Sequence, residues 1–429
     1  MEIISEAAMT AMRMPRFEDG CINLQELIRQ LAESVVNEIM DAEADQMCAA
    51  QKNTRNGYRE RKLKTCVGTL TLKVPKLRSG SFFPEDVIER YQRVDRALVA
   101  AVAEMYATGT STRKVQKIAE KLGVDRLSKD QVSAIAQSLD ADVDELLSRD
   151  LSAIRMPYLW LDATYVKCRR DGRVASTAVV TAIGSDEEGW RRVLGISVVD
   201  TESYDSWKGF LATIRKRGVH GAELVVSDAH EGLKRAIAEE FQGAAWQRCV
   251  VHLTRDCVRE AKTWQLKRRV AKIVAPVFRA KDAGVVRCAY HLACEMLEEC
   301  CPKAAAIMEE AEVDALAYLD FPCSHWKRLR TNNVQERTNR EIKRRSRVVQ
   351  VFPSVRSLER LAGAVMCEED ELWSDKRYFA ESKIAELYDE KRAKQKPQPP
   401  TPEQEEELRL IAKKAIEASL ELADELEAA

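Results

Sequence analysis

The pattern of hydrophobic residues changes between residues 157 and 255, and this change constrains the fold more than any other feature of the chain. Apolar residues there form short runs of strand length, separated by turn residues such as Asp171-Gly172. The order is three successive strands, an amphipathic helix that ends at Gly218, a strand, a helix and a further strand. This order predicts a mixed α/β domain, in which helices cover a mixed sheet.

An aspartate interrupts the first of these apolar runs, which reads LWLDATY over residues 159–165. A buried carboxylate is costly to desolvate unless a positive charge meets it, so Asp162 lies either at a solvated strand end or against cations. We read Asp162 as the end of its strand and Asp228, in LVVSDAH, as the end of another. If those strands are neighbours, both carboxylates emerge at the same edge of the sheet. They can then share Mg²⁺ or Mn²⁺, which prefer carboxylate and water ligands.

A third acid is needed to complete such a cation site. Glu336, within TNNVQERTNREIKRR, is the natural candidate, because the bases around it could hold DNA phosphates across its carboxylate. It lies 108 residues after Asp228, whereas Asp228 lies 66 residues after Asp162. The longer gap does not fit a connection inside a compact fold, so we predict a helical insertion over residues 257–330. Two divalent cations held by these carboxylates would orient the attacking oxygen and stabilise the leaving oxygen at phosphorus.

Charge is distributed unevenly along the chain, although the formal net charge is only −1. Residues 337–347, RTNREIKRRSR, carry six bases and one acid, whereas residues 400–429 carry nine acids and three bases. An acidic tail can therefore hide a basic working surface in the whole-chain average. The basic run is either a solvated helix face or part of a DNA groove, and its closeness to Glu336 favours the groove.

The N-terminal region is predicted to be mainly helical. Residues 21–50 have apolar positions at helical spacing, and a basic segment then leads into the strand-like alternation of VGTLTLKVPKL. Residues 95–122 read as two helices divided at Thr108-Gly109. A further helix starts near Ser128 and continues into DADVDELLSR.

Two helices around a glycine-containing turn, the second with a polar head, form a helix-turn-helix pattern. This pattern places Lys129 and Gln131 at a DNA groove. An ordinary helical hairpin has the same pattern, so both interpretations stay open on the residues alone.

The composition, with 45% hydrophobic and 32% charged residues, is that of a soluble globular protein. The N-terminus lacks the features of a signal peptide and no apolar stretch is long enough to span a bilayer, so we expect a cytoplasmic protein without membrane contact. The twelve cysteines are expected to be reduced thiols. Cys249 and His252 form a CxxH pair, which is half of a zinc site, but no CxxC occurs in the sequence.

Several stretches together resemble the mutator-type transposases of bacterial insertion sequences, which are DDE enzymes with a ribonuclease H-like core. The matching stretches, in family order between about residues 50 and 380, are RNGYRERKLKTCVGTLTLKVPKLRSGSFFP, EMYATGTSTRKV, LWLDATYVKCR, AIGSDEEGWRRVLGI, SDAHEGLKRAI, WQRCVVHLTRD and HWKRLRTNNVQERTNREIKRRSRVVQVFP. The order of strands and helices from residue 157 onward is also the one used by ribonuclease H-like nucleases.

The resemblance implies that Asp162, Asp228 and Glu336 are the catalytic triad and the ligands of Mg²⁺ or Mn²⁺, with two ions expected. It makes Cys249 and His252 the family's CxxH signature. Trp326 matches a tryptophan that relatives keep before the glutamate, where it either stacks on a displaced base or packs in the core. One departure is Arg255-Asp256, where relatives often have Arg-Asn.

The resemblance further implies a DNA transposase that hydrolyses strand ends and joins the released 3′-hydroxyl to another phosphodiester. Its partners would be double-stranded DNA, both the terminal inverted repeats and the target, and it would act as a homodimer on DNA in the bacterial cytoplasm, associated with the nucleoid. Two alternatives remain. One is a ribonuclease H-like nuclease that cuts without joining, and the other is a host-adopted DNA-binding protein that has lost catalysis.

The predicted architecture is a ribonuclease H-like core interrupted by an all-helical insertion and preceded by a mainly helical DNA-binding region. The expected domains are residues 1–94 for DNA-end binding, 95–150 for the helix-turn-helix, 151–256 and 331–392 for the two parts of the core, 257–330 for the insertion, and 393–429 for the proline-rich linker and acidic helical tail. The expected DNA contacts are Arg55, Arg59, Arg61, Lys62, Lys129, Gln131, Arg337, Arg340, Lys343, Arg344, Arg345 and Arg347.

Overall fold

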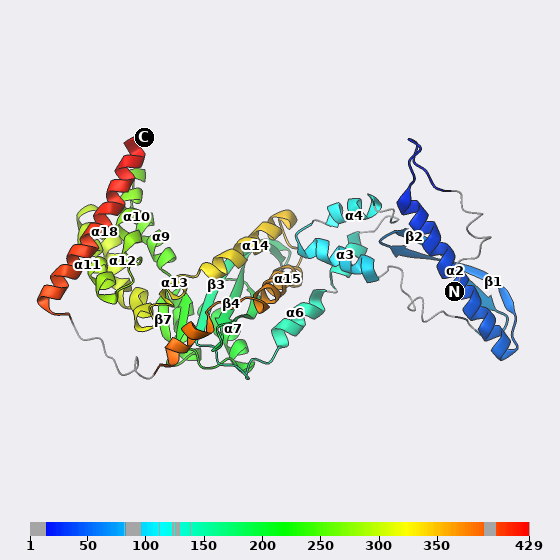
Figure 1. Ribbon diagram of the computed structural model, residues 1–429, viewed down its shortest axis with the longest axis horizontal. Helices are drawn as coiled ribbons and strands as arrows, with labels where there is room; N and C mark the ends of the chain where they lie inside the picture. The colour runs from blue at the N-terminus through cyan, green and yellow to red at the C-terminus, as the bar shows by residue number, and fades with distance from the viewer. Residues whose placement is uncertain are drawn as a thin grey trace. The chain divides into compact units, whose positions relative to one another are not determined.

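The computed structural model describes residues 14–80, 82, 96–110, 112–121, 124, 129–137, 139–389 and 400–428 (Figure 1). Its contacts divide the chain into two units, Met1–Ala141 and Asp142–Ala429, and each is described by itself. Ser128 and most of the proline-rich linker lie outside the described residues. None of the described helices is both long and apolar enough to cross a membrane.

The first unit contains a long helix and a β-hairpin. Helix α2 (Leu24–Gln51) packs on β2 (Gly68–Leu77), which pairs antiparallel with β1 (Arg55–Thr65). Met40 and Ala44 of the helix meet Leu72 and Val74 of the hairpin in a small core. The helix and the second strand confirm the sequence prediction. The basic segment at β1, for which we predicted no strand, is strand because the alternating β2 gives its backbone a partner.

Three further helices of the first unit, α3 (Arg96–Ala107), α4 (Thr112–Lys121) and α5 (Lys129–Ala136), share a second apolar cluster. The predicted break at Thr108-Gly109 is confirmed, and Gly109 has a positive φ of 89°. The single helix predicted beyond residue 128 is wrong. Helix α5 ends at Ala136, and α6 (Leu139–Ser148) follows as a separate helix. Most of α6 belongs to the second unit, in which Arg356 pairs with Asp144 at 2.8 Å.

The second unit contains a five-stranded mixed sheet with strand order β5-β4-β3-β6-β7. Its strands and their two connecting helices are β3 (Tyr158–Arg170), β4 (Arg173–Ser185), β5 (Arg191–Val199), α7 (Tyr204–Lys216), β6 (Leu224–Ser227), α8 (Glu231–Glu240) and β7 (Ala245–Arg248). The first three strands are antiparallel, and β6 and β7 run parallel to β3. The predicted order of strands and helices is therefore confirmed, as is the mixed α/β class.

Local sequence explains the turns that shape this sheet. Asp171 and Gly172 have φ values of 46° and 77°, which suit the tight turn of a two-residue β-hairpin between β3 and β4. Gly218 follows the last turn of α7 with φ 99°, a backbone conformation that favours glycine after a helix. A side chain there would also collide with Ser152. Both positions match the turns predicted from sequence.

Helices cover both faces of the sheet. On one face α7 and α8 bury Trp207 and Leu233 against Leu159 and Leu161 of β3. On the other face lie α14 (Asn333–Val349) and α15 (Val355–Ser374), and α14 contacts β3, β4 and α15. Because successive side chains of a strand point to opposite faces, the even-numbered residues of β3 face α14. Asp162 is one of them.

Helices fill the sequence between β7 and α14. They are α9 (Val250–Glu260), α10 (Trp264–Val277), α11 (Ala283–Cys300), α12 (Pro302–Leu316), a 3₁₀ turn at Ala317–Asp320 and α13 (Trp326–Leu329). The helical character of residues 257–320 is as predicted. The further strand of the predicted order was expected to cover AAWQRCVVHL, and this extent is wrong. The short strand β7 ends at Arg248, and Val250 already begins α9.

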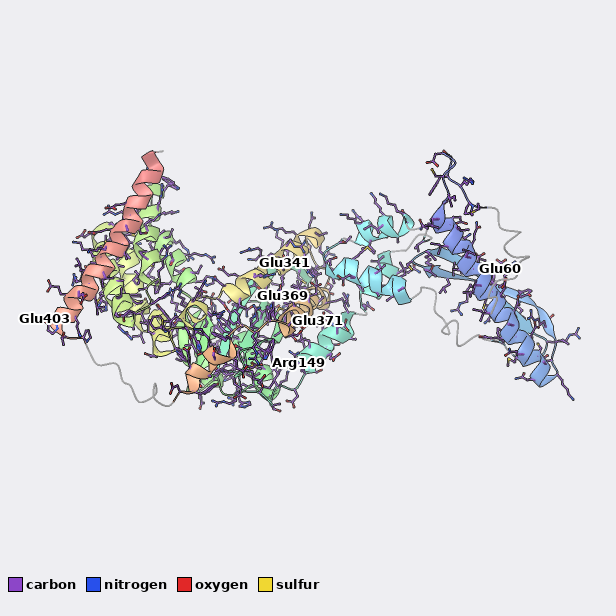
Figure 2. All side chains as sticks on the ribbon, in the orientation of Figure 1. Glu60, Arg149, Glu341, Glu369, Glu371 and Glu403 are labelled. Atoms are coloured by element: carbon purple, nitrogen blue, oxygen red, sulfur yellow. The ribbon has the colours of Figure 1, made fainter. Side chains whose placement is uncertain are left out.

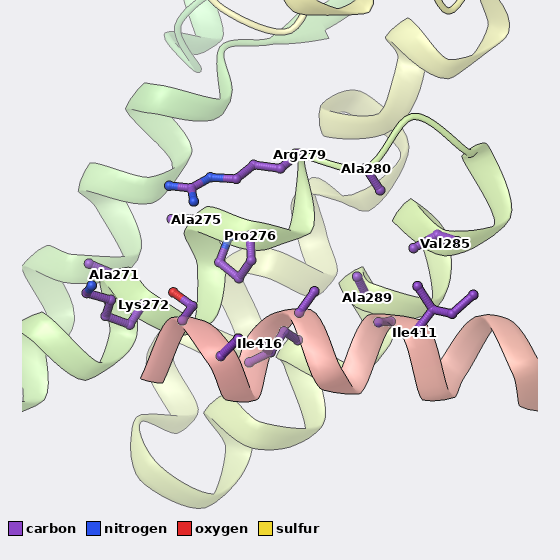
Figure 3. Close-up of a pocket in the computed structure, with 14 residues that line it drawn as sticks. Ala271, Lys272, Ala275, Pro276, Arg279, Ala280, Val285, Ala289, Ile411 and Ile416 are labelled. Atoms are coloured by element: carbon purple, nitrogen blue, oxygen red, sulfur yellow. The ribbon is translucent and has the colours of Figure 1, made fainter. Parts of the chain in front are cut away.

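The acidic tail forms α18 (Pro402–Ala428). This helix packs against α10 and α11 (Figures 1 and 3). Ala412 and Ile416 are fully buried, and Arg409 pairs with Glu295 at 2.6 Å. A cavity of about 640 Å³ remains between these three helices, with Ile411 and Pro276 among its lining residues. Before α18, the body ends with α16 (Glu381–Ile384) and a 3₁₀ turn at Ala385–Tyr388.

Candidate active site

We predicted from the sequence that Asp162 ends its strand, and this prediction is wrong. Asp162 lies inside β3, which continues to Arg170. It lies instead where the parallel partner β6 stops. Each paired residue of β3 faces the β6 residue 66 positions later, as Tyr158 faces Leu224 and Trp160 faces Val226. The same offset joins Asp162 to Asp228, directly after the last residue of β6. The expected approach of the two carboxylates therefore has its basis in the register of two neighbouring strands.

The Asp162 carboxylate is buried, with 8% of the residue exposed. It accepts hydrogen bonds from the Asn339 side-chain amide at 2.8 Å and from the Ala163 backbone N–H at 3.0 Å. The pKa of Asp162 is raised to about 7, mainly by burial and secondly by the nearby negative charge of Asp228. The two hydrogen bonds oppose this shift without removing it. Neither donor carries a positive charge that would offset the negative charges of the two aspartates.

Helix α14 is held on the sheet by side-chain amides and not by apolar packing alone. Asn332 donates to the Leu161 carbonyl at 2.8 Å, and Gln335 donates to the Trp160 carbonyl at 2.7 Å. With Asn339, these residues have the i, i+3, i+7 spacing of one helical face. They are all buried, so the helix cannot rotate without leaving polar groups unsatisfied.

Glu336 lies in the first turn of α14, on the residue after Gln335. Its carboxylate does not meet the two aspartates in a metal-binding group, and none of the described residues forms such a group of three or more His, Cys, Asp or Glu side chains. It is paired with Arg255 of α9 at 2.9 Å. Glu336 is nevertheless near the aspartates, because it and Asp162 line one cavity.

That cavity has a volume of about 560 Å³ and a strongly basic wall. Its lining residues are Asp162, Ala163, His252, Arg255, Glu336, Asn339, Arg340, Glu341, Lys343, Arg344 and Arg347. Glu341 is labelled on α14 in Figure 2. Asp162 lies on the sheet side of the cavity, whereas α14 contributes two acids and four exposed bases. The excess of bases suits a polyanion lying across the carboxylates.

The CxxH residues join α9 to this site. Cys249 is buried directly before α9, and its sulfur accepts the backbone N–H of Asn332 at 3.3 Å, so it helps to position the start of α14. His252 lines the cavity, and desolvation lowers the pKa of its imidazole below 6.5, although Asp228 opposes the shift. The structure thus places both residues beside the carboxylates without forming the zinc site that the spacing left open.

The basic residues of α14 divide into two groups. Arg337, Arg340, Lys343, Arg344 and Arg347 are exposed, as a DNA-binding face requires. Arg345 is only 7% exposed and donates to both oxygens of Glu368 on α15, at 2.7 and 2.6 Å. We therefore revise the expectation that Arg345 contacts DNA and assign it to the packing of α14 on α15.

The other expected contact residues lie in the first unit and near the insertion. Arg59, Arg61 and Lys62 lie on β1, Lys129 begins α5, and Gln131 lies in the first turn of α5. Arg55 is held by Asp41 and Asp45 at 2.7 and 2.8 Å, which reduces its availability to DNA. Trp326 is 7% exposed, packs edge to face on Tyr318 and donates to the Phe321 carbonyl, so it is a core residue.

Sequence reasoning missed the amides Asn332, Gln335 and Asn339 and the role of Arg255. The signal for the amides was present in TNNVQERTN, where polar residues at helical spacing occupy the face that an ordinary amphipathic helix fills with apolar side chains. Arg255 gave no comparable signal, because only the fold brings it to Glu336, which lies 81 residues further along the chain.

Comparisons with known proteins support a single family. Residues 6–376 match the family model described as "Transposase, Mutator family". The chain is 37% identical over 364 residues to the transposase for insertion sequence element IS1081 of Mycobacterium tuberculosis, covering 82% of this chain and 87% of the relative. It is 37% identical over 362 residues to the transposase for IS256 in transposon Tn4001 of Staphylococcus aureus, covering 83% and 92%. The transposase for ISRM5 of Rhizobium meliloti is 38% identical over 368 residues, covering 81% and 89%.

Proposed function

The chain belongs to the Mutator family of transposases, and we propose that Asp162, Asp228 and Glu336 are the carboxylates with which it cleaves and joins DNA. It is a DNA transposase that mediates transposition of an insertion sequence. The observation that carries the residue assignment is the register of β3 and β6. This register sets Asp162 level with Asp228, and Asp162 lines a cavity that Glu336 also lines.

Membership of this family implies the use of a divalent metal ion, and the side chains present fit Mg²⁺ or Mn²⁺. The donors are hard carboxylate oxygens, which these cations prefer. The buried Asp162 lies beside a second negative charge, Asp228, and the amide groups that donate to it carry no charge. The side-chain carbonyl oxygen of Asn339, buried in the same cavity wall, also has no hydrogen-bond partner. We propose that two ions bind here.

Bound cations supply charge stabilisation for the attacking and leaving oxygens of an in-line displacement at phosphorus. The protein supplies position. Asn339 holds one oxygen of Asp162, and Asn332 and Gln335 fix the helix that carries Glu336. Arg340, Lys343, Arg344 and Arg347 face the phosphates of the bound strand, so the backbone lies across the carboxylates with little freedom to shift.

We further propose that the mixed sheet with α7, α8, α14 and α15 is a ribonuclease H-like core, in which α9–α13 form the insertion. Its support is the strand order β5-β4-β3-β6-β7 with β6 and β7 parallel to β3, together with the helices on both faces. We propose that α4 and α5 form the helix-turn-helix of an end-binding region that includes the basic hairpin. A transposon has two ends, so a homodimer on DNA is the proposed working form.

The proposed reaction is tested with the purified protein, a duplex that carries the element's terminal inverted repeat, and target DNA in Mg²⁺. We expect cleavage that exposes a 3′-hydroxyl at the element end, followed by joined products, and chelation with EDTA should stop both steps. A duplex supplied already cleaved should bypass only the first step. Cleavage without any joined product from either substrate would favour a nuclease and would contradict the assignment.

A further inference from the structure

Glu336, the third of the proposed metal-binding carboxylates, is paired with an arginine in this structure. The Arg255 guanidinium lies 2.9 Å from a Glu336 carboxylate oxygen. The Arg255 side chain is 57% exposed and that of Glu336 27% exposed, so the pair lies at the mouth of the cavity and not in its floor. Ion pairs with this exposure contribute little free energy and exchange readily.

The neighbours of this pair are far more constrained than the pair itself. Asp162 is buried and held by Asn339 at 2.8 Å. The backbone of α14 is fixed just before Glu336, by Asn332 at 2.8 Å from the Leu161 carbonyl and by Gln335 at 2.7 Å from the Trp160 carbonyl. The parts of the site that can change at low cost are therefore the side chains of Glu336 and Arg255.

If Arg255 is released from Glu336, its guanidinium can contact a DNA phosphate in the same cavity. Arg255 projects from α9, whereas the other bases of the cavity, Arg340, Lys343, Arg344 and Arg347, all come from α14. A guanidinium freed from Glu336 would add a donor from a second element, and its planar fork suits the two oxygens of a phosphodiester. The cavity would then hold the DNA backbone from two helices instead of one.

We propose that Arg255 exchanges between two partners, Glu336 and a phosphate of bound DNA, and we call this exchange the gate. The inference rests on the proposed function. In the first state, which the structure describes, Arg255 pairs with Glu336 at 2.9 Å and offsets its negative charge. When a divalent cation binds at Asp162 and Asp228, Glu336 turns to it and Arg255 transfers to a phosphate of the bound DNA. Arg255 is thus a positioning residue in the first state and a DNA-binding residue in the second.

The gate predicts effects of opposite sign on metal and DNA affinity, which a merely structural ion pair would not give. Arg255→Gln keeps most of the side-chain length but removes the charge. Because the cation no longer competes with the guanidinium, we expect Mn²⁺ to bind about three to five times more tightly, as measured from the free Mn²⁺ signal in electron paramagnetic resonance. Arg255→Lys, which keeps the charge, should retain nearly the wild-type Mn²⁺ affinity.

DNA affinity is measured on the same proteins with a pre-cleaved end duplex whose 3′ terminus is dideoxy, so that no joining occurs. Arg255→Gln should weaken binding about threefold or more in saturating Mn²⁺ and leave it unchanged in EDTA, where Arg255 is engaged with Glu336. Arg259→Gln is the matched control. Arg259 lies one turn further along α9, is 74% exposed, pairs with Asp256 and does not line the cavity, so this change should alter neither affinity.

Unchanged or weaker Mn²⁺ binding by Arg255→Gln would overturn the gate, as would an equal loss of DNA affinity with and without Mn²⁺. A different failure identifies the proposed function as the error. If the wild type binds Mn²⁺ no better than Asp162→Asn does, there is no carboxylate metal site, and the gate falls with it. Far-ultraviolet circular dichroism of each variant confirms that the fold is intact before these comparisons are made.

Discussion

Burial of Asp162 beside Asp228 makes the metal-free site sensitive to pH. The pKa of Asp162 is about 7 in the folded protein and 3.8 is its ordinary value, so the folded state binds a proton more tightly than the unfolded state. A group with a raised pKa contributes stability that is complete below pH 4 and is lost as pH rises through 7. A bound cation replaces the proton, and metal binding should therefore strengthen over the same interval.

This argument predicts a pH-dependent difference between the wild type and Asp162→Asn in EDTA. Between pH 5 and pH 7 the wild type should lose about 2–3 kcal/mol of unfolding free energy that the variant retains, because the introduced amide cannot ionise, and each pKa unit is worth about 1.4 kcal/mol. Urea unfolding at the two pH values measures the difference. The two proteins would have parallel pH profiles if Asp162 were ionised at an ordinary pKa.

Single residues also show how far sequence alone leads. Asp162, Asp228 and Glu336 could be found from an acid in an apolar run, a second acid after another run and a third within a basic helix. Arg255 and Asn339 could not be assigned roles in the same way, because their significance comes from contacts across 81 and 177 residues of sequence. Such pairs are set by tertiary packing, in which α14 lies on the sheet and α9 packs on α10 and α12, and not by local pattern.

At the scale of elements, α14 carries both exposed basic residues and a buried arginine, and the sequence alone only partly distinguishes them. Successive residues of a helix lie about 100° apart around its axis, so Arg344 and Arg345 point in different directions, and the structure gives them different partners. Arg344 is exposed and pairs with Glu341 at 2.9 Å within its own helix, whereas Arg345 is buried against Glu368 of α15. The surface that each contacts, and hence its function, follows from tertiary packing.

Replacing these two arginines should therefore affect different properties. Arg344→Ala should weaken the binding of end and non-end DNA alike and reduce the slope of log affinity against log salt by about one, because one phosphate contact is lost. Arg345→Ala should instead lower the unfolding free energy by roughly 1–3 kcal/mol, since Glu368 is left half-buried without its partner. Salt-dependent binding and urea unfolding separate the two. A loss of DNA affinity in folded Arg345→Ala equal to that in Arg344→Ala would contradict this division.

The amide face of α14 gives a second prediction at this scale. Gln335 is fully buried, donates to the carbonyls of Trp160 and Thr181, and accepts from the Thr181 hydroxyl at 2.9 Å. Gln335→Ala removes these bonds and leaves a cavity, so we expect a loss of about 2–4 kcal/mol in unfolding free energy. Asn333→Ala, at an exposed position two residues earlier, should cost less than about 0.5 kcal/mol. Equal costs would show that the amides do not hold the helix.

At the scale of the whole molecule, the two units suggest a division of labour between end recognition and chemistry. The contacts divide the chain after Ala141, whereas we expected a domain limit at residue 150, because most of α6 contacts α15 within the second unit. Sequence periodicity identified the helices on each side, but it could not show which body α6 joins. The docking of α18 on α10 and α11 was likewise hidden, since its apolar stripe is narrow and most of its surface is acidic.

A fragment spanning residues 1–141 should bind the terminal inverted repeat in preference to random duplex. Its affinity should fall steeply with salt, because Arg59, Arg61 and Lys62 on β1 would displace counterions from phosphates. Fluorescence anisotropy at several salt concentrations, with both duplexes, provides the measurement. Equal affinity for the two duplexes would place sequence recognition outside this unit.

The central claim is that three carboxylates act together in one metal-dependent cleavage site, and single-turnover cleavage of an end duplex in Mg²⁺ tests it most directly. Asp162→Asn, Asp228→Asn and Glu336→Gln should each reduce the cleavage rate by at least about a thousandfold, an effect of several kcal/mol, while end-binding affinity changes little. Glu310→Gln, which alters an exposed acid on α12, should cleave like the wild type. Cleavage by any of the three variants at near wild-type rate, with normal dependence on Mg²⁺, would contradict the account.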